Sequence, residues 1–194
     1  MILAVDLGTD MLPALALGAE KPDPGVMSRP PRARGVRLLS WGLIARAYLF
    51  LGVLEAAASM AVFFFVLDAA GWRYGDLPGK IDPLYLQATT GCLAAIVMTQ
   101  VANVFLCRHP LKSSLSFGLI SNPLILLGIA AELGLILFIV YTPAGNWLLG
   151  TAPVGPEVWS LAALFAASMW ASEEARKVWL RWTVRRRYRP AAAQ

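Results

Sequence analysis

The sequence predicts an all-α integral membrane protein, a bundle of five transmembrane helices. Hydrophobic residues make up 58% of the 194 residues and charged residues only 15%, a composition that excludes most soluble classes. The apolar residues are gathered in five runs, and each is close to the length of about 20 residues that a helix needs to cross a bilayer. The predicted spans are residues 2–19, 43–67, 86–107, 119–141 and 158–180 within one membrane domain, residues 1–183.

The positive charges alternate between the predicted loops. Lys and Arg are gathered in the irregular segment 20–42, in the loop after the third span and in the basic tail, 184–194. Because cytoplasmic loops are enriched in Lys and Arg, the N-terminus is predicted to lie outside and the C-terminus in the cytoplasm. The net charge of +5 is thereby explained by topology and lipid headgroups, and no nucleic-acid partner is predicted. With almost nothing before the first span, the chain reads as if cut from a longer protein.

The first predicted span contains V-D-L-G-T-D-M-L-P, residues 5–13. Asp6, Thr9 and Asp10 are three and four residues apart, so a helix would present their oxygens on one face. Pro13 has no backbone N–H, which leaves the carbonyl of Thr9 without its helical partner. Two carboxylates at this depth are costly in lipid and predict a cation site near the bilayer midplane. The alternative is a kinked helix whose aspartates pair with arginines elsewhere.

Charged residues also interrupt the later spans. Glu55, midway along the second span, is predicted to make a structural hydrogen bond. Arg46 lies one turn inside the cytoplasmic face and is predicted to be a snorkelling anchor. Glu173 precedes Arg176 and Lys177 by three and four residues, a spacing typical of ordinary helix-face ion pairs worth a few tenths of a kcal/mol.

The run D-L-G-T-D-M-L-P-A-L-A-L, residues 6–17, is followed by V-M-S-R-P-P-R at 26–32. Together they resemble the sixth transmembrane helix and following loop of the type II P-type cation-transporting ATPases, the group of the calcium, sodium/potassium and proton/potassium pumps. The resemblance continues along the chain, so the five spans look like the last five of the ten helices in such a pump. E-E-A-R-K, residues 173–177, resembles the acidic-basic cluster at the inner end of the tenth helix.

The resemblance implies a set of ligands for a transported cation. Asp6 and Asp10 look like carboxylate ligands, and Thr9 looks like an oxygen donor between them. Gln100 and Asn103 fall where the eighth helix of the sodium/potassium type has a glutamine and an aspartate.

The chain departs from the family patterns in ways that leave the cation open. Asn103 is an amide where the sodium/potassium type has a carboxylate, and Asp6 replaces the asparagine usual in calcium pumps. The resemblance therefore leaves Ca²⁺, Na⁺, K⁺ and H⁺ as possible cations. Glu132 falls at a glutamate of the ninth helix, where two roles stay open: an additional ion or proton path, or a neutral glutamic acid hydrogen-bonded between helices.

The motifs that carry ATP chemistry in this family, D-K-T-G-T and T-G-E, do not occur in the sequence. The chain alone is not expected to hydrolyse ATP or to hold a cofactor; ATP and Mg²⁺ belong to the missing domains of a complete pump. The expected partners are the lipid bilayer of the plasma membrane and the N-terminal half of the pump, with its first five helices and cytoplasmic domains.

Two other functions are alternatives to a pump segment. A pump-derived membrane scaffold or regulator without enzymatic activity would tolerate neutral residues at Asp6 and Asp10. An unrelated channel or secondary transporter would be expected to contain an internal repeat. The D-x-x-x-D pattern occurs only in the first span, which disfavours this second alternative.

Overall fold

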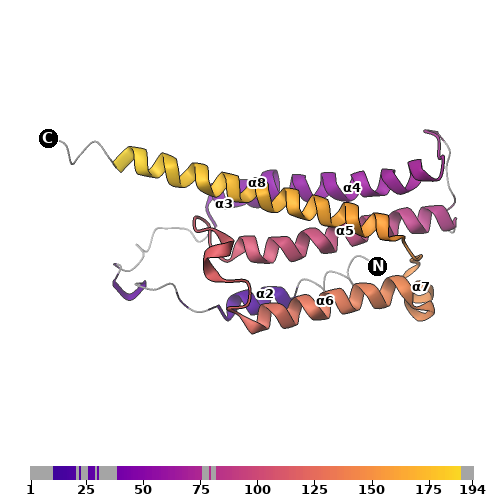
Figure 1. Cartoon of the computed structure of the whole chain (residues 1–194), viewed down its shortest axis with the longest axis horizontal. Coiled ribbons are helices and arrows are strands. Elements are labelled where there is room, and N and C mark those ends of the chain that lie inside the picture. The colour runs from indigo at the N-terminus through magenta and orange to yellow at the C-terminus, as the bar shows by residue number, and fades with distance from the viewer. Residues whose placement is uncertain are drawn as a thin grey trace.

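The computed structural model describes residues 11–20, 22, 26–28, 30, 39–75, 79 and 82–188, and this part of the chain is helical without strands (Figure 1). The predicted all-α class is therefore confirmed. A π-helical stretch, Ala45–Leu51, joins α3 to α4, and two short 3-10 helices are Val26–Ser28 and Ser114–Phe117. The α-helices are α2 (Met11–Gly18), α3 (Trp41–Ile44), α4 (Gly52–Ala69), α5 (Pro83–Cys107), α6 (Pro123–Tyr141), α7 (Pro143–Leu149) and α8 (Pro156–Tyr188).

Three helices in the described part of the chain are long and apolar enough to cross a membrane: Trp41–Ala69, α5 and α6. Helix α8 is longer, at 33 residues, but its second half is strongly charged. Of the predicted first span, residues 11–18 form α2, and residues 2–10 lie outside the described part. The number of five spans therefore stays a prediction.

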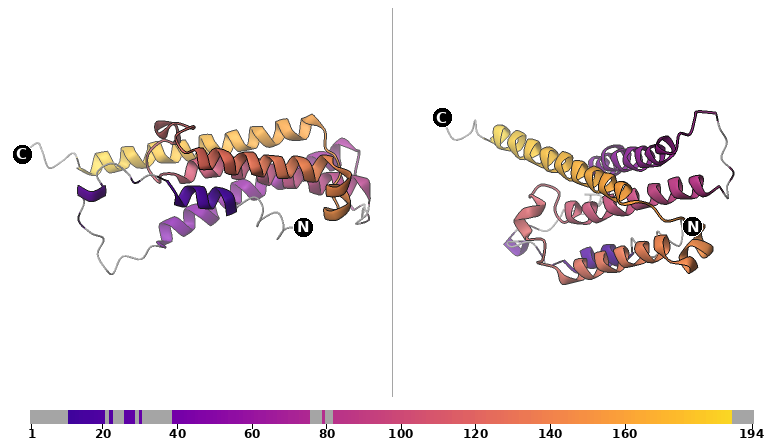
Figure 2. Two further views of the ribbon diagram at one scale, coloured as in Figure 1. Left: turned by 90° about the horizontal axis from the view of Figure 1, so that it is seen from below. Right: turned by 45° about the vertical axis from the view of Figure 1, so that its right-hand side comes forward.

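Helix α5 is the centre of the bundle. It packs against both α4 and α8, and it contacts α6 and α2 on its other side (Figures 1 and 2). Gly91 allows the close approach, because an added Cβ would lie 3.3 Å from side-chain atoms of Val62, Val66 and Val158. The main core cluster joins all four long helices and includes the buried residues Val62, Val97, Ile136 and Ala162.

Helix α7 lies in a segment that the sequence presents only as an uncharged loop. The hydroxyl of Thr142 accepts a hydrogen bond from the backbone N–H of Gly145 at 3.0 Å, and Pro143 takes the first turn. Gly150 ends the helix with φ of +64°. A capping threonine, a proline at the first position and a terminal glycine are the usual helix boundaries, so this signal is present in the sequence.

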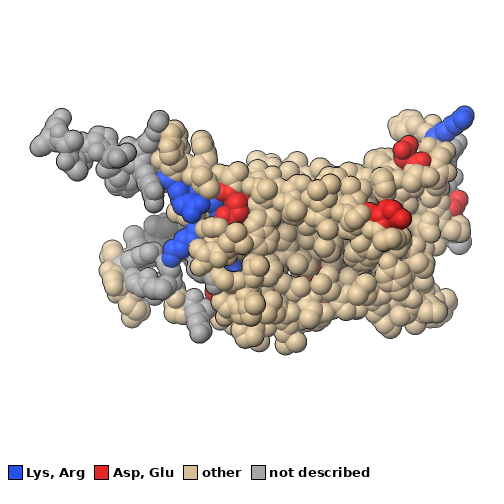
Figure 3. Space-filling model, viewed as in Figure 1, with Lys and Arg blue, Asp and Glu red and all other residues tan. Residues whose placement is uncertain are grey.

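Charged side chains gather at the two ends of the bundle, with a wide uncharged band between them on the viewed face (Figure 3). Most of the visible Lys and Arg side chains lie at one end, around the second half of α8. This distribution suits a bundle whose middle faces hydrocarbon, because charge at that depth is costly.

The ion pairs of α8 differ from those that the sequence predicts. Glu173 pairs with Arg176, as expected, but it also pairs with Arg46 at 2.7 Å between Nη2 and Oε1. Glu173 has no exposed side-chain surface and Arg46 only 12%. The prediction that Arg46 is a snorkelling anchor is therefore wrong, because the guanidinium turns inward to a buried carboxylate.

Lys177 is also buried, and its ion pair is with Glu174, at 3.3 Å. Its ammonium donates further hydrogen bonds to the carbonyl of Leu106 and to the hydroxyl of Ser114, both at 3.1 Å. Helix spacing suggested an ion pair of Lys177 with Glu173. Lys177 instead pairs with Glu174, and the carbonyl of Leu106 at the facing end of α5 accepts a hydrogen bond from its ammonium. The last carbonyls of a helix attract cations, and Leu106 lies in the last turn of α5.

Candidate ion-binding site

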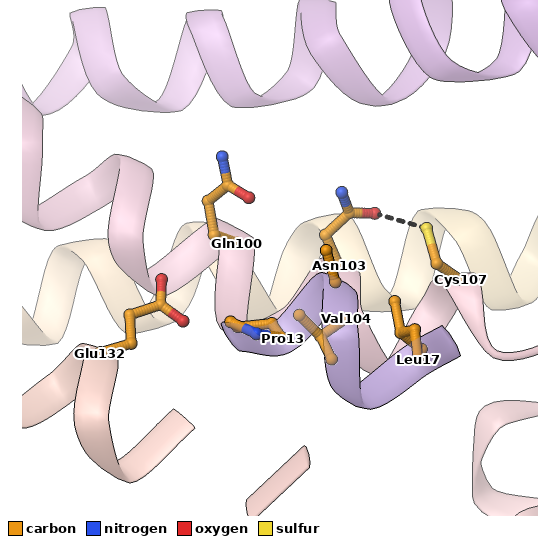
Figure 4. Close-up of a pocket in the computed structure, with 8 residues that line it drawn as sticks. Pro13, Leu17, Gln100, Asn103, Val104, Cys107 and Glu132 are labelled. Carbon is orange, nitrogen blue, oxygen red and sulfur yellow. Dashed lines mark hydrogen bonds between the residues drawn. The ribbon is translucent and has the colours of Figure 1, made fainter. Parts of the chain in front are cut away.

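A pocket of about 200 Å³ lies between α2, α5 and α6. It brings together three of the residues that the sequence nominated as ligands: Gln100 and Asn103 of α5 and Glu132 of α6 (Figure 4). The remaining lining residues are Pro13, Ala14, Leu17, Val104 and Cys107. Polar side chains from two long helices therefore share one pocket between apolar helices.

The α5 wall follows from helical spacing. Gln100, Asn103 and Cys107 lie three and four residues apart, so they share one face of the helix. The thiol of Cys107 donates to the amide oxygen of Asn103 at 3.4 Å. The amide nitrogen of Gln100 donates to the carboxyl oxygen Oε1 of Glu55, on α4, at 3.2 Å. Glu55 therefore makes a hydrogen bond between helices, and its partner is a residue of the pocket.

Glu132 supplies a carboxyl group to the opposite wall. Its side chain is 1% exposed, and Figure 4 shows it extending from α6 toward α5. Burial in an apolar helix penalises the charged form, so this group needs a cation, a proton or hydrogen bonds to stay there. Its position is compatible with both roles that the sequence leaves open.

The third wall is α2, which packs closely on α6. Gly128 makes this possible, because an added Cβ would lie 3.2 Å from the backbone nitrogen of Pro13 and 3.3 Å from the carbonyl carbon of Leu12. Ala16 packs in the same interface, in a cluster with Ile125 and other apolar side chains. The start of α2 is therefore held against α6 at the edge of the pocket.

A polar cluster fixes the other end of α2. Arg108, directly after α5, pairs with Glu20 at 2.5 Å and donates to the hydroxyl of Ser121 at 2.5 Å. The amide nitrogen of Asn122 donates to Glu20 at 2.9 Å and to the carbonyl of Ala16 at 3.0 Å. The oxygen of Asn122 also caps α6 by accepting from the N–H of Leu124. The cluster thus ties α2 to the ends of both helices that carry the pocket residues.

This cluster predicts a pH dependence of stability. Burial acts to raise the pKa of Glu20, but hydrogen bonds from Arg108 and Asn122 and the charge of Arg108 outweigh it and hold the pKa below its usual 4.5. A carboxyl group whose pKa folding lowers stabilises the folded state above its unfolded pKa, and this stability is lost as pH falls through the folded pKa. We expect the free energy of unfolding in mixed micelles to fall below about pH 4.5, and Glu20→Gln to remove that part of the fall. Identical pH profiles for the two proteins would contradict this.

Asp6, Thr9 and Asp10 lie outside the described residues. Asp10 is bonded to Met11, the first residue of α2, and the pocket is lined from Pro13 onward. The predicted hydrogen bond of Glu55 is present. The sequence reasoning missed two parts of the site: the partner of Glu55, which is Gln100, and the Arg108 cluster. A carboxyl group in the middle of a span indicates that Glu55 has a polar partner, but no local sequence pattern predicts that this partner is Gln100.

Carboxyl and amide side chains that meet between apolar helices are a candidate ion site in a membrane domain. The comparison with known families agrees: the family described as "Cation transporting ATPase, C-terminus" matches residues 1–179. The chain belongs to this family of cation-transporting ATPases, as the C-terminal membrane portion.

Similar proteins are alpha subunits or chains of sodium/potassium-transporting and potassium-transporting ATPases. The sodium/potassium-transporting ATPase subunit alpha of Tetronarce californica is 29% identical in an alignment of 205 positions, gaps included, that covers 93% of this chain and 20% of that protein. The sodium/potassium-transporting ATPase subunit alpha-3 of Homo sapiens is 28% identical, again over 93% of this chain and 20% of its own length. The potassium-transporting ATPase alpha chain 2 of Oryctolagus cuniculus is 27% identical, over 93% and 19%. The chain spans about a fifth of the length of these relatives.

Proposed function

We propose that this chain supplies oxygen ligands for the transported cation in the ion-translocating membrane domain of a P-type pump. The observation that carries the proposal is the pocket, which gathers Gln100, Asn103 and Glu132 against the first turns of α2. Asp10 immediately precedes that helix in the chain. The proposed ligands are Asp6, Thr9, Asp10, Gln100, Asn103 and Glu132.

The donor types support a hard cation. Carboxylate, hydroxyl and amide oxygens are the ligands that hard cations prefer. Several carboxyl groups in one low-dielectric site would repel each other if all were ionised, so a bound cation or a proton relieves the repulsion. The same donor set suits Ca²⁺, Na⁺ or K⁺, and protonated carboxyl groups would carry H⁺.

We propose that the remainder of the pump is supplied by polypeptide other than these 194 residues. The relatives are about five times longer than the matched segment, and we propose that their counterpart here provides the first five helices and the domains that use ATP and Mg²⁺. The lipid bilayer of the plasma membrane surrounds the bundle, with the N-terminus of this chain outside and its C-terminus cytoplasmic.

The test is cation-stimulated ATP hydrolysis in membranes that contain this chain together with the N-terminal part of the same pump. We expect hydrolysis to require both parts. The double variant Asp6→Asn/Asp10→Asn keeps side-chain size but removes two negative charges from the site, so we expect it to lose cation stimulation. The assay should be run over separate titrations of Ca²⁺, Na⁺, K⁺ and pH to identify the cation.

Asp68→Asn is the matched control, because Asp68 is an exposed carboxyl group at the C-terminal end of α4 and does not line the pocket. It should retain stimulation. Membrane insertion of both variants must match the wild type before activities are compared. Full stimulation in the Asp6→Asn/Asp10→Asn variant would contradict the proposal and favour the scaffold alternative.

A further inference from the structure

Glu55 lies in the middle of the membrane-capable helix Trp41–Ala69, and neither the family resemblance nor the proposed ligand set includes it. A carboxyl group at that depth is a functional-site hypothesis by default, and the first question is what it contacts. The structure answers this for one of its oxygens: Oε1 accepts a hydrogen bond from Nε2 of Gln100. Gln100 lines the pocket, whereas Glu55 contacts Gln100 and is not itself one of the lining residues.

The chemistry of an amide makes this contact directional. The side chain of Gln100 has an oxygen that can bind a cation and a nitrogen that can only donate hydrogen bonds. Both atoms lie on the same planar group, so fixing the nitrogen also fixes the oxygen. A cation site can use Gln100 only when the oxygen, and not the NH₂ group, is presented to the cation.

The carboxyl oxygen of Glu55 selects one of the two orientations. It accepts from the NH₂ group and so holds this end of the amide toward α4. Figure 4 shows the nitrogen of Gln100 directed away from α2 and the oxygen on the side of Asn103. In the reversed amide, two oxygens would face each other, which costs a hydrogen bond and adds repulsion.

We propose that Glu55 is a positioning residue of the ion site, which holds the Gln100 amide with its oxygen available to the transported cation. This rests on the proposed function of the pocket. It extends that function to a fourth helix, α4, by giving a role to a carboxyl group that the ligand set does not use.

The test is a double-mutant cycle in the assembled pump, with the cation concentration for half-maximal ATP hydrolysis and the maximal rate measured separately. Glu55→Leu removes the acceptor, and we expect the half-maximal concentration to rise about 5- to 10-fold, as for one lost hydrogen bond, with a smaller change in maximal rate. Glu55→Gln retains an acceptor oxygen and should stay within about 2-fold, a fraction of that bond. In a Gln100→Leu background, Glu55→Leu should add no further change.

Two results would overturn the proposal. An equal effect of Glu55→Leu with and without Gln100 would show that Glu55 does not act through this amide. An effect of Glu55→Gln as large as that of Glu55→Leu would show that the charge itself is required, as for a direct ligand. The Asp6→Asn/Asp10→Asn variant is assayed in parallel. If the proposed function itself is wrong, this variant keeps its cation stimulation; if only the role of Glu55 is wrong, the variant loses it.

A second measurement is independent of pump activity. The side-chain NH₂ resonances of Gln100, recorded by NMR on the full chain in lipid nanodiscs, are assigned by their loss in Gln100→Leu. We expect them to shift in Glu55→Leu and to stay in place in Val53→Ala, a change at a 56% exposed position of the same helix. Unchanged resonances in Glu55→Leu would overturn the hydrogen bond and the proposal with it.

Discussion

Glu173→Gln is expected to lower the free energy of unfolding by about 3–5 kcal/mol, the range for removing one partner of a buried ion pair. The carboxylate of Glu173 is fully buried, forms an ion pair with Arg46 and accepts hydrogen bonds from Arg176. The amide keeps the volume but cannot neutralise two guanidinium groups, which would then repel each other at the junction of α8 with the π-helical stretch. Equilibrium unfolding of the chain in mixed micelles of a mild detergent and SDS measures the change.

Glu157→Gln is the matched control for this experiment. Glu157 lies in the first turn of the same helix, α8, and is exposed. Its only expected loss is a favourable interaction with the helix dipole, about 0.3–1 kcal/mol. A result for Glu173→Gln no larger than this control would mean that the ion pairs behave as exposed helix-face pairs, as their sequence spacing alone suggests.

Gly128→Leu is expected to separate α2 from α6. An added Cβ already lies 3.2–3.3 Å from backbone atoms of Leu12 and Pro13, and backbone cannot rotate away as a side-chain end can. Overpacking of this kind costs about 1–3 kcal/mol. Because the same contact forms one wall of the pocket, we expect cation-stimulated ATP hydrolysis in the assembled pump to need a higher cation concentration.

Gly134→Leu tests whether this effect comes from the contact or from the loss of a helical glycine. Gly134 is in the same helix, α6, but an added Cβ there meets no atom within 4 Å. Replacing a helical glycine at an open position should be neutral or stabilising, by up to about 1 kcal/mol. If the two variants behave alike in the unfolding and hydrolysis assays, then α2 does not depend on close packing at Gly128.

The sequence was sufficient for the features that depend on local composition. Apolar runs predicted the all-α membrane class, and the resemblance at residues 6–17 and 26–32 predicted the family. Gln100, Asn103 and Glu132 were nominated from the resemblance, and the structure places all three in one pocket. The roles of these residues as ligands, and those of Asp6, Thr9 and Asp10, stay predictions.

Some local signals were present but were not used. Helix α7 follows from a capping threonine, a proline and a glycine, yet the segment is too short to span a membrane and reads as a loop. Helix α8 likewise continues to Tyr188, beyond the predicted end of its span at residue 180. Hydropathy locates apolar runs, and it says little about where a helix continues into water.

Only the tertiary structure decided which polar residues meet. The sequence pattern offers two cations to Glu173, Arg176 and Lys177. Packing of α8 against the start of the helix Trp41–Ala69 adds Arg46 to its partners, and Lys177 pairs with Glu174. No sequence pattern predicts that Glu55 contacts Gln100, or that Arg108 contacts Glu20. Hydropathy and helix periodicity are properties of neighbouring residues, so the sequence by itself determined the class of helices and their polar faces. A pair between helices depends on their relative rotation and depth, which the packing of small residues such as Gly91 and Gly128 sets.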